Sequence, residues 1–273
     1  MAIMARTFVN NPQEALDVLD EIPAASLDLE NCTYCRQRIE TEAEANISLG
    51  NYREALRTLR LLPDFVQERR FKTLEVRALA RLGRIRQIRA LIETCAAEQP
   101  TMDVRYLNFS AAREFELLER EDLKLEFGER ALALYQDTSS SFRPNQTMTG
   151  RTLYLFGRLE EAEQLFADRV AARPTSRSAH AFLGIVQAAQ GKTEEALARI
   201  DSLSGFERQY DLGYIPYRQA RIYAKLGQLS SACEQLNRAL TEDQRFIFTA
   251  FSNEPDFLDL KDERCFRPYL DPQ

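Results

Sequence analysis

The sequence has few of the residues and motifs from which most enzyme active sites are built. Histidine occurs once, at His180. The phosphate-binding signatures G-x-x-x-x-G-K-[ST] and G-x-G-x-x-G do not occur. The serine run at 139–141 lacks the context of a nucleophile elbow, and no paired acid–base constellation stands out. The sequence therefore predicts that the protein is not an enzyme and needs no cofactor.

Cysteine is also scarce, with five residues that are odd in number and scattered. This usage favours reduced thiols in a cytoplasmic protein over a disulfide framework. Cys32 and Cys35 form a C-x-x-C, but Cys95, Cys233 and Cys265 are isolated, so four zinc ligands are not assembled. A redox motif would need a thioredoxin-like βα context, which the pattern lacks. We expect thiols at the start of a helix and no metal site.

Long apolar runs are missing as well. None approaches the roughly 18 residues needed to span a bilayer, and the first eight residues lack a secretory apolar region. The net charge of −6 argues against general attraction to nucleic acid. A basic run over 69–89 is present, but no recognition helix or groove-reading motif accompanies it. We expect a cytoplasmic protein that binds neither membranes nor nucleic acid.

What the sequence does contain is a repeat. Gly191 lies between two amphipathic segments, and Gly157 and Gly227 stand at equivalent places 34 residues before and 36 residues after it. Counted from Gly50, successive turns are 33, 36, 38, 34 and 36 residues apart, although the segment 119–124 replaces one glycine turn. Such a period indicates stacked helix-turn-helix units. The first turn, near residues 10–15, follows only nine residues, so either the first helix is short or the chain was cut from a longer protein.

Excess length falls at 22–31 and 137–145, and the second of these stretches is rich in serine. It is interpreted either as a hinge between two lobes or as a surface loop. After residue 240 the pattern changes. An apolar helix is expected at 246–251, followed by a turn with two apolar anchors at 253–260. A solenoid needs a terminal element that covers its last helix pair, so residues 241–273 are predicted to be capping helices.

The aligned residues resemble the tetratricopeptide repeat family, whose units carry small residues at positions 8 and 20 and a large one at 24. The unit that begins at Arg143 has Gly150, Ala162 and Phe166 at these positions. Units beginning at residues 36, 177 and 213 follow the same pattern. The resemblance implies an all-α, right-handed α-solenoid of about six to seven units over residues 1–240. It places His180 at position 4, a packing position, so no Ser-His-Asp set is expected around it.

The segment 254–266 looks like the closing segment of repeat arrays in bacterial signalling proteins. Such arrays often follow a kinase, cyclase or DNA-binding effector domain. This resemblance implies a sensory or docking module.

The family lines a concave groove with positions 2, 5, 9 and 12 of each first helix. Position 9 holds arginine in four of six units, and aromatic residues stand nearby. The predicted groove residues are Arg70, Arg77, Tyr106, Phe109, Arg113, Arg151, Tyr154, Tyr214, Tyr217 and Arg221. Arginine forks bind carboxylate or phosphate, and aromatics supply anchors. The alternative is that these arginines pair with neighbouring Glu and Asp side chains.

Two functional hypotheses follow. The first is a non-catalytic interaction scaffold whose groove binds an acidic or C-terminal peptide of a protein partner. The family's carboxylate clamp, Lys at position 5 and Asn at position 9, is not reproduced, because Thr73 and Arg77 stand there. The second is a regulatory sensor segment of a larger bacterial signalling protein, which binds a small ligand or its own effector domain.

Overall fold

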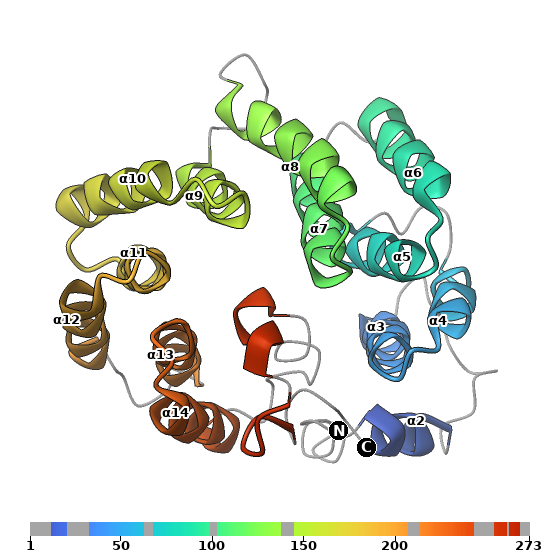
Figure 1. Ribbon diagram of the computed structural model, residues 1–273. Coiled ribbons are helices and arrows are strands. Elements are labelled where there is room, and N and C mark those ends of the chain that lie inside the picture. Colours follow the sequence, from blue (N-terminus) through green and yellow to red (C-terminus); the bar gives the residue numbers. More distant parts are fainter. Residues whose placement is uncertain are drawn as a thin grey trace. The chain divides into compact units, whose positions relative to one another are not determined.

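The computed structural model describes residues 12–20, 33–62, 68–98, 103–137, 145–206, 213–242, 254–260 and 262–267. Within these ranges it contains thirteen α-helices, one 3₁₀ helix and no strand (Figure 1). The predicted all-α helical-repeat fold is confirmed. None of the described helices is both long and apolar enough to cross a membrane.

The chain divides into two compact units, and among the described residues the boundary follows Ala131. The first unit contains α2 (Pro12–Asp20), α3 (Thr33–Ser48), α4 (Tyr52–Leu59), α5 (Arg69–Arg81), α6 (Ile85–Glu98), α7 (Val104–Leu117) and most of α8 (Glu121–Gln136). The second contains α9 (Gln146–Leu155), α10 (Leu159–Ala172), α11 (Arg177–Ala189), α12 (Thr193–Ser204), α13 (Tyr214–Lys225), α14 (Leu229–Glu242) and the 3₁₀ helix η2 (Pro255–Leu260).

Three predictions about connecting and terminal segments are not decided by these residues. Most of the stretch 137–145 and all of the apolar segment 246–251 lie outside the described ranges. The interpretation of 137–145 as a hinge therefore stays a prediction, as does the assignment of 241–273 to capping helices.

The repeat is visible in the backbone of its turns. Six turn residues have left-handed φ, namely Gly50, Gly83, Glu119, Gly157, Gly191 and Gly227. At Gly191 the turn N–H donates to Ala188 O at 3.0 Å, and the next N–H, from Lys192, donates to Gln187 O at 2.9 Å. This Schellman pattern satisfies carbonyls at the end of the first helix, and the second helix starts two residues after the turn residue. All six turns share it.

The degenerate fourth turn has the same geometry without a glycine. Glu119 has φ 54°, its N–H donates to Glu116 O at 3.1 Å, and Arg120 N–H donates to Phe115 O at 2.9 Å. A side chain in this conformation costs about 1–2 kcal/mol. The neighbouring units therefore impose the turn on a residue that disfavours it.

Glu119→Gly is expected to stabilise the chain by about 0.5–1 kcal/mol, because relief of the left-handed strain exceeds the entropy that glycine adds to the unfolded state. Gly191→Ala, at an equivalent turn with open space around the added methyl group, is the matched opposite change and should destabilise by about 1 kcal/mol. Urea denaturation measures both. Equal stability of Glu119→Gly and the wild type would contradict the strain argument.

Small residues let the paired helices approach closely. A Cβ added to Gly150 of α9 would lie 2.6 Å from Cζ of Phe166 in α10, and one added to Gly184 of α11 would lie 2.9 Å from Cβ of Arg199 in α12. The alanines five residues after the turn glycines, Ala55, Ala162, Ala196 and Ala232, are fully buried. The predicted small residues at positions 8 and 20 thus lie where two helices meet.

Gly150→Ala is expected to destabilise the chain by about 1–3 kcal/mol, because the new methyl group overlaps the ring of Phe166 and a packed interior yields little. A double-mutant cycle with Phe166→Leu tests the cause, since the smaller side chain makes room. The double variant should lose less stability than the sum of the single changes. Strict additivity would show that the overlap is not the origin.

His180 is a packing residue, as predicted. It lies in α11 and is buried, its ring is T-shaped to Phe206 at a centroid distance of 5.2 Å, and its Nε2 lies 2.8 Å from Pro174 O. The ring therefore helps to join α11 to the end of α12.

The prediction of reduced thiols is wrong. Cys233 of α14 and Cys265 form a disulfide, and Cys35 is disulfide-bonded as well. Within the described residues Cys95 is a free, buried thiol, and Cys32 lies outside them. The pairing was not readable from spacing. Cys233 and Cys265 are separated by 32 residues and meet only because the segment after η2 folds back onto α14.

Candidate peptide-binding site

The ten predicted groove residues lie on the first helices of their hairpins, in two groups. Arg70 and Arg77 belong to α5, and Tyr106, Phe109 and Arg113 belong to α7, all in the first unit. Arg151 and Tyr154 of α9 and Tyr214, Tyr217 and Arg221 of α13 lie in the second unit. Each group has its own electrostatic surroundings.

In the first unit, arginines of α5 pair with carboxylates of adjacent helices. Arg77 Nε donates to Glu114 Oε1 at 2.9 Å, and Arg81 Nε donates to Glu114 Oε2 at 2.8 Å. Glu114 projects from α7, and its side chain is only 4% exposed. Arg70 lies 2.7 Å from Glu40 and 2.8 Å from Glu68. Arg70 and Arg77 thus satisfy the alternative interpretation, in which these arginines form intramolecular ion pairs.

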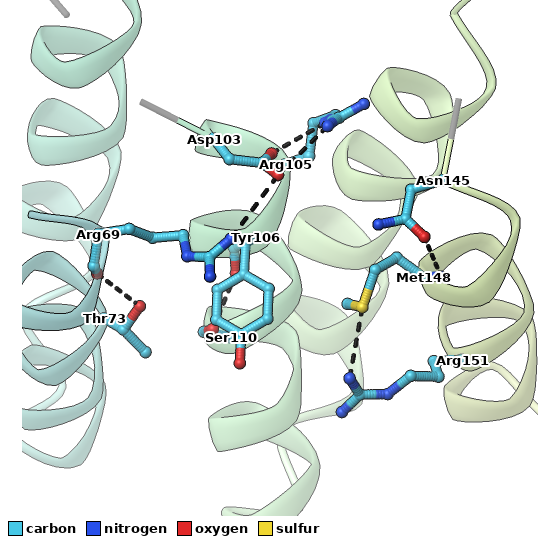
Figure 2. A network of polar contacts seen from close by, with 9 residues as sticks. All are labelled: Arg69, Thr73, Asp103, Arg105, Tyr106, Ser110, Asn145, Met148 and Arg151. Atoms are coloured by element: carbon cyan, nitrogen blue, oxygen red, sulfur yellow. Dashed lines mark hydrogen bonds and ion pairs between the residues drawn. The ribbon is translucent and has the colours of Figure 1, made fainter. Parts of the chain in front are cut away.

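Tyr106 is covered by a cation from the neighbouring helix (Figure 2). The guanidinium of Arg69 lies 4.7 Å from its ring centroid and 4.0 Å from the Asp103 carboxylate. Thr73, at the place of the clamp lysine, donates its hydroxyl to Arg69 O at 2.8 Å. The hydroxyl of Thr73 is therefore engaged by its own helix.

Glu44 of α3, at position 9 of its unit, differs from the arginines at the equivalent positions. Burial raises its pKa to about 7, Arg77 lowers it, and Glu40 adds to the rise. A carboxyl group with this pKa takes up a proton near neutral pH. The first unit therefore contains a carboxyl group that titrates in the physiological range.

The raised pKa has a consequence for stability. In the unfolded chain Glu44 titrates near 4.5. The favourable contribution of Glu44 to the free energy of unfolding is therefore complete below pH 4.5. It is lost as the pH rises through about 7. Glu44→Gln removes the cost of burying the carboxylate. It should stabilise the chain by about 2–3 kcal/mol at pH 8 and by little at pH 4. Denaturation at both pH values measures this, and a pH-independent effect would contradict it.

In the second unit, the predicted residues hold an acidic segment of the same chain, Glu254–Phe257, which is called the acidic segment below. Arg221 of α13 donates from Nε to Asp256 Oδ2 at 2.7 Å, and its Nη2 lies 2.6 Å from the same oxygen. Nη2 also lies 3.3 Å from Glu254 Oε1. Lys225, one turn further along α13, places Nζ 3.5 Å from Asp256 Oδ1.

Two tyrosines complete the contacts. Tyr154 of α9 donates its hydroxyl to Asp256 Oδ1 at 2.5 Å, and Tyr217 of α13 donates to Glu254 Oε2 at 3.0 Å. Phe257 is fully buried, with its ring 6.2 Å from that of Tyr217 and 5.8 Å from that of Phe266. We call Tyr154, Tyr217, Arg221 and Lys225 the carboxylate site. Figure 1 shows η2 beside α13.

The charges of this cluster depend on one another. Burial disfavours the charged form of Arg221, but Asp256 and Glu254 raise its pKa above the usual value. Burial alone would raise the pKa of Asp256, yet Arg221 and Lys225 hold it below its ordinary range. Burial and then the charge of Asp256 raise the pKa of Tyr154 well above its usual value, so its hydroxyl stays a donor. The cluster therefore contains two cations, Arg221 and Lys225, facing two carboxylates, with Tyr154 as a neutral donor beside them.

Arg151 and Tyr214, the remaining predicted residues of the second unit, take part in cation–π contacts. The guanidinium of Arg151 lies 5.3 Å from the ring centroid of Phe182 and 3.3 Å from Met148 Sδ (Figure 2). Arg218 lies 4.9 Å from the ring centroid of Phe182 and 5.1 Å from that of Tyr214. These cations lie on the helices that also carry the carboxylate site, α9 and α13.

Sequence reasoning missed the partner of this site. Position analysis selected Tyr154, Tyr217 and Arg221, but it did not connect them with Glu254 and Asp256. The available signal was charge complementarity between an arginine row and an acidic E-x-D tail. Lys225, which also faces Asp256, lies outside the positions assigned to the groove. In the part of the chain that the structure describes, no group of three or more His, Cys, Asp and Glu side chains is arranged to hold a metal ion.

Comparison with known proteins bears on one unit of the repeat. The family model Tetratricopeptide repeat matches residues 177–202, which form α11 and most of α12. The match therefore covers one helix-turn-helix unit. The tetratricopeptide resemblance is thus supported here, while the likeness to arrays of bacterial signalling proteins stays a hypothesis. No curated protein matches the sequence.

Two solved structures are similar to the chain. One, titled MamA AMB-1, is 19% identical, with 63% of this chain and 96% of that chain covered and a TM-score of 0.33. The other, the TPR2AB domain of yeast Sti1 in a complex with pHSP90, is 15% identical, with 92% of each chain covered and a TM-score of 0.33.

Proposed function

We propose that this protein is a non-catalytic interaction scaffold that binds an acidic peptide segment of a protein partner on the first helices of its repeats. One observation carries the proposal. Arg221, Tyr154 and Tyr217 were predicted from the sequence as ligand-binding residues. They bind two carboxylates of the acidic segment of the same chain, those of Glu254 and Asp256. These helices therefore present chemistry suited to acidic peptides.

The residue types on these first helices support this proposal. Arginine and tyrosine are the residues that most often dominate binding energy at interfaces, because they combine directional donors with large buried surfaces. Arg113 and Arg151 occupy the same repeat position as Arg221 in other units. A cytoplasmic location is not part of the proposal, because the disulfides remove the reduced-thiol argument on which it rested.

A regulatory segment of a longer signalling protein is the second candidate. It is favoured by the same contacts, because the occupant of the carboxylate site comes from the chain itself. The full open reading frame distinguishes the two candidates. A kinase, cyclase or DNA-binding domain encoded upstream would decide for the regulatory segment.

The scaffold function is tested by binding of the full chain to an array of acidic peptides. Arg113→Glu and Arg151→Glu, made separately and together, should lower the affinity for the bound acidic peptides at least tenfold. This corresponds to about 1.4 kcal/mol of binding free energy and results from charge repulsion. Arg130→Glu in α8 and Arg238→Glu in α14 are matched surface controls that should change binding little. If the combined variant keeps every partner at wild-type affinity, the predicted face does not bind them.

A further inference from the structure

We infer that the acidic segment is an internal ligand of the carboxylate site, and that the partner of this site presents the same chemistry, two carboxylates two residues apart followed by an aromatic residue. This inference rests on the proposed function and specifies one of its sites. The partner class is thus an acidic peptide of the form Glu-x-Asp-aromatic, which displaces the acidic segment.

The acidic segment and the carboxylate site are complementary atom by atom. Both oxygens of Asp256 are engaged, Oδ2 by Arg221 and Oδ1 by Tyr154 with Lys225 nearby. Both oxygens of Glu254 are engaged as well, one by Tyr217 and the other by Arg221. Four oxygens thus meet four side chains from two helices. Glutamine or asparagine at these positions would bring amide donors toward a cationic site, so the geometry selects carboxylates.

The charges of the carboxylate site and of the acidic segment are shielded from water. The side chains of Arg221 and Asp256 are only 5% and 2% exposed. A buried guanidinium without a carboxylate is strongly unfavourable, so the site cannot stay closed and empty. When the acidic segment leaves, either water or another acidic group must replace it. An incoming peptide with the same carboxylate spacing restores every charge contact, which a neutral peptide cannot do.

Phe257 anchors the acidic segment by apolar contacts. Phe257 follows Asp256 directly and is fully buried against Tyr217 and Phe266. An aromatic side chain at this place contributes apolar burial that the charged pair cannot supply. The order of the three groups, Glu then Asp then Phe, therefore defines a recognition pattern and not only a negative charge.

The acidic segment is attached to the repeat helices as a tethered ligand would be. Its residues 255–257 lie in η2, which is a short 3₁₀ helix and not a member of any helix-turn-helix pair. The disulfide between Cys233 and Cys265 ties the chain after η2 to α14. A tethered ligand acts at a high effective concentration, in the millimolar range for a short tether, so an external peptide must outcompete it. The segment therefore suppresses binding by weak acidic peptides.

The test uses the full chain and a fluorescent peptide with the sequence of residues 254–260, Glu-Pro-Asp-Phe-Leu-Asp-Leu, with binding followed by anisotropy. Wild-type protein should bind it weakly. Two variants weaken the internal ligand, Glu254→Gln with Asp256→Asn, and Phe257→Ala. The second keeps every charge in place and covers the case in which the first does not fold. At least one folded variant should bind the peptide ten times more tightly than the wild type.

Three controls test whether the gain in peptide affinity comes from the carboxylate site. Glu263→Gln removes an exposed carboxylate outside the carboxylate site and should leave peptide binding at the wild-type level. A peptide with Gln and Asn in place of its first two acidic residues should bind neither variant. Adding Arg221→Ala to Phe257→Ala should abolish the gain.

The possible outcomes separate this inference from the proposed function. Folded variants that bind the peptide no better than the wild type, while acidic array peptides still bind through Arg113 or Arg151, would overturn the internal ligand and leave the scaffold function intact. Loss of all acidic-peptide binding in every protein would reject the scaffold function itself. A wild-type dimer in light scattering that dissociates in Phe257→Ala would assign the segment to a second copy of the chain and overturn the external partner.

Discussion

The buried charge of Arg221 is the constraint on which the second unit depends. A guanidinium on a packed helix must be matched by carboxylates, because burial of an uncompensated ion costs several kcal/mol. Here the match comes from Asp256 and Glu254, which lie 35 and 33 residues further along the chain. The position of η2 beside α13 thus has an electrostatic cause as well as an apolar one. Arg221 holds the segment by charge, and Phe257 holds it by burial.

The helical repeat could be predicted from the sequence because its determinants are local. A glycine turn, an alanine five residues later and a small residue in the first helix each act within a single hairpin, and each recurs with the period. Even the turn without glycine could be placed, since Glu119 lies at the expected distance and adopts the left-handed conformation. The close approach at Gly150 follows from the same local pattern.

The site could be predicted only in part, because its second half depends on contacts that are distant in sequence. Repeat positions identified Tyr154, Tyr217 and Arg221, since the phase of a helix decides which face a residue occupies. They did not identify Glu254 and Asp256, whose position depends on how the chain returns to α13. The Cys233–Cys265 disulfide was missed for the same reason. The raised pKa of Glu44 also escaped prediction, because it arises from burial and from charges on neighbouring helices.

Both units pair arginines of a first helix with carboxylates, but the carboxylates are attached to the chain in different ways. In the first, the carboxylate between Arg77 and Arg81 belongs to Glu114, which is built into α7. It cannot leave without unfolding that helix, so this pairing is structural. In the second, the carboxylates lie at the start of the short 3₁₀ helix η2, outside the paired helices. In the internal-ligand inference they leave while α9 and α13 stay folded. The same residue types then form an ion pair within the repeat helices in one unit and an exchangeable one in the other, and the attachment of the acid decides which.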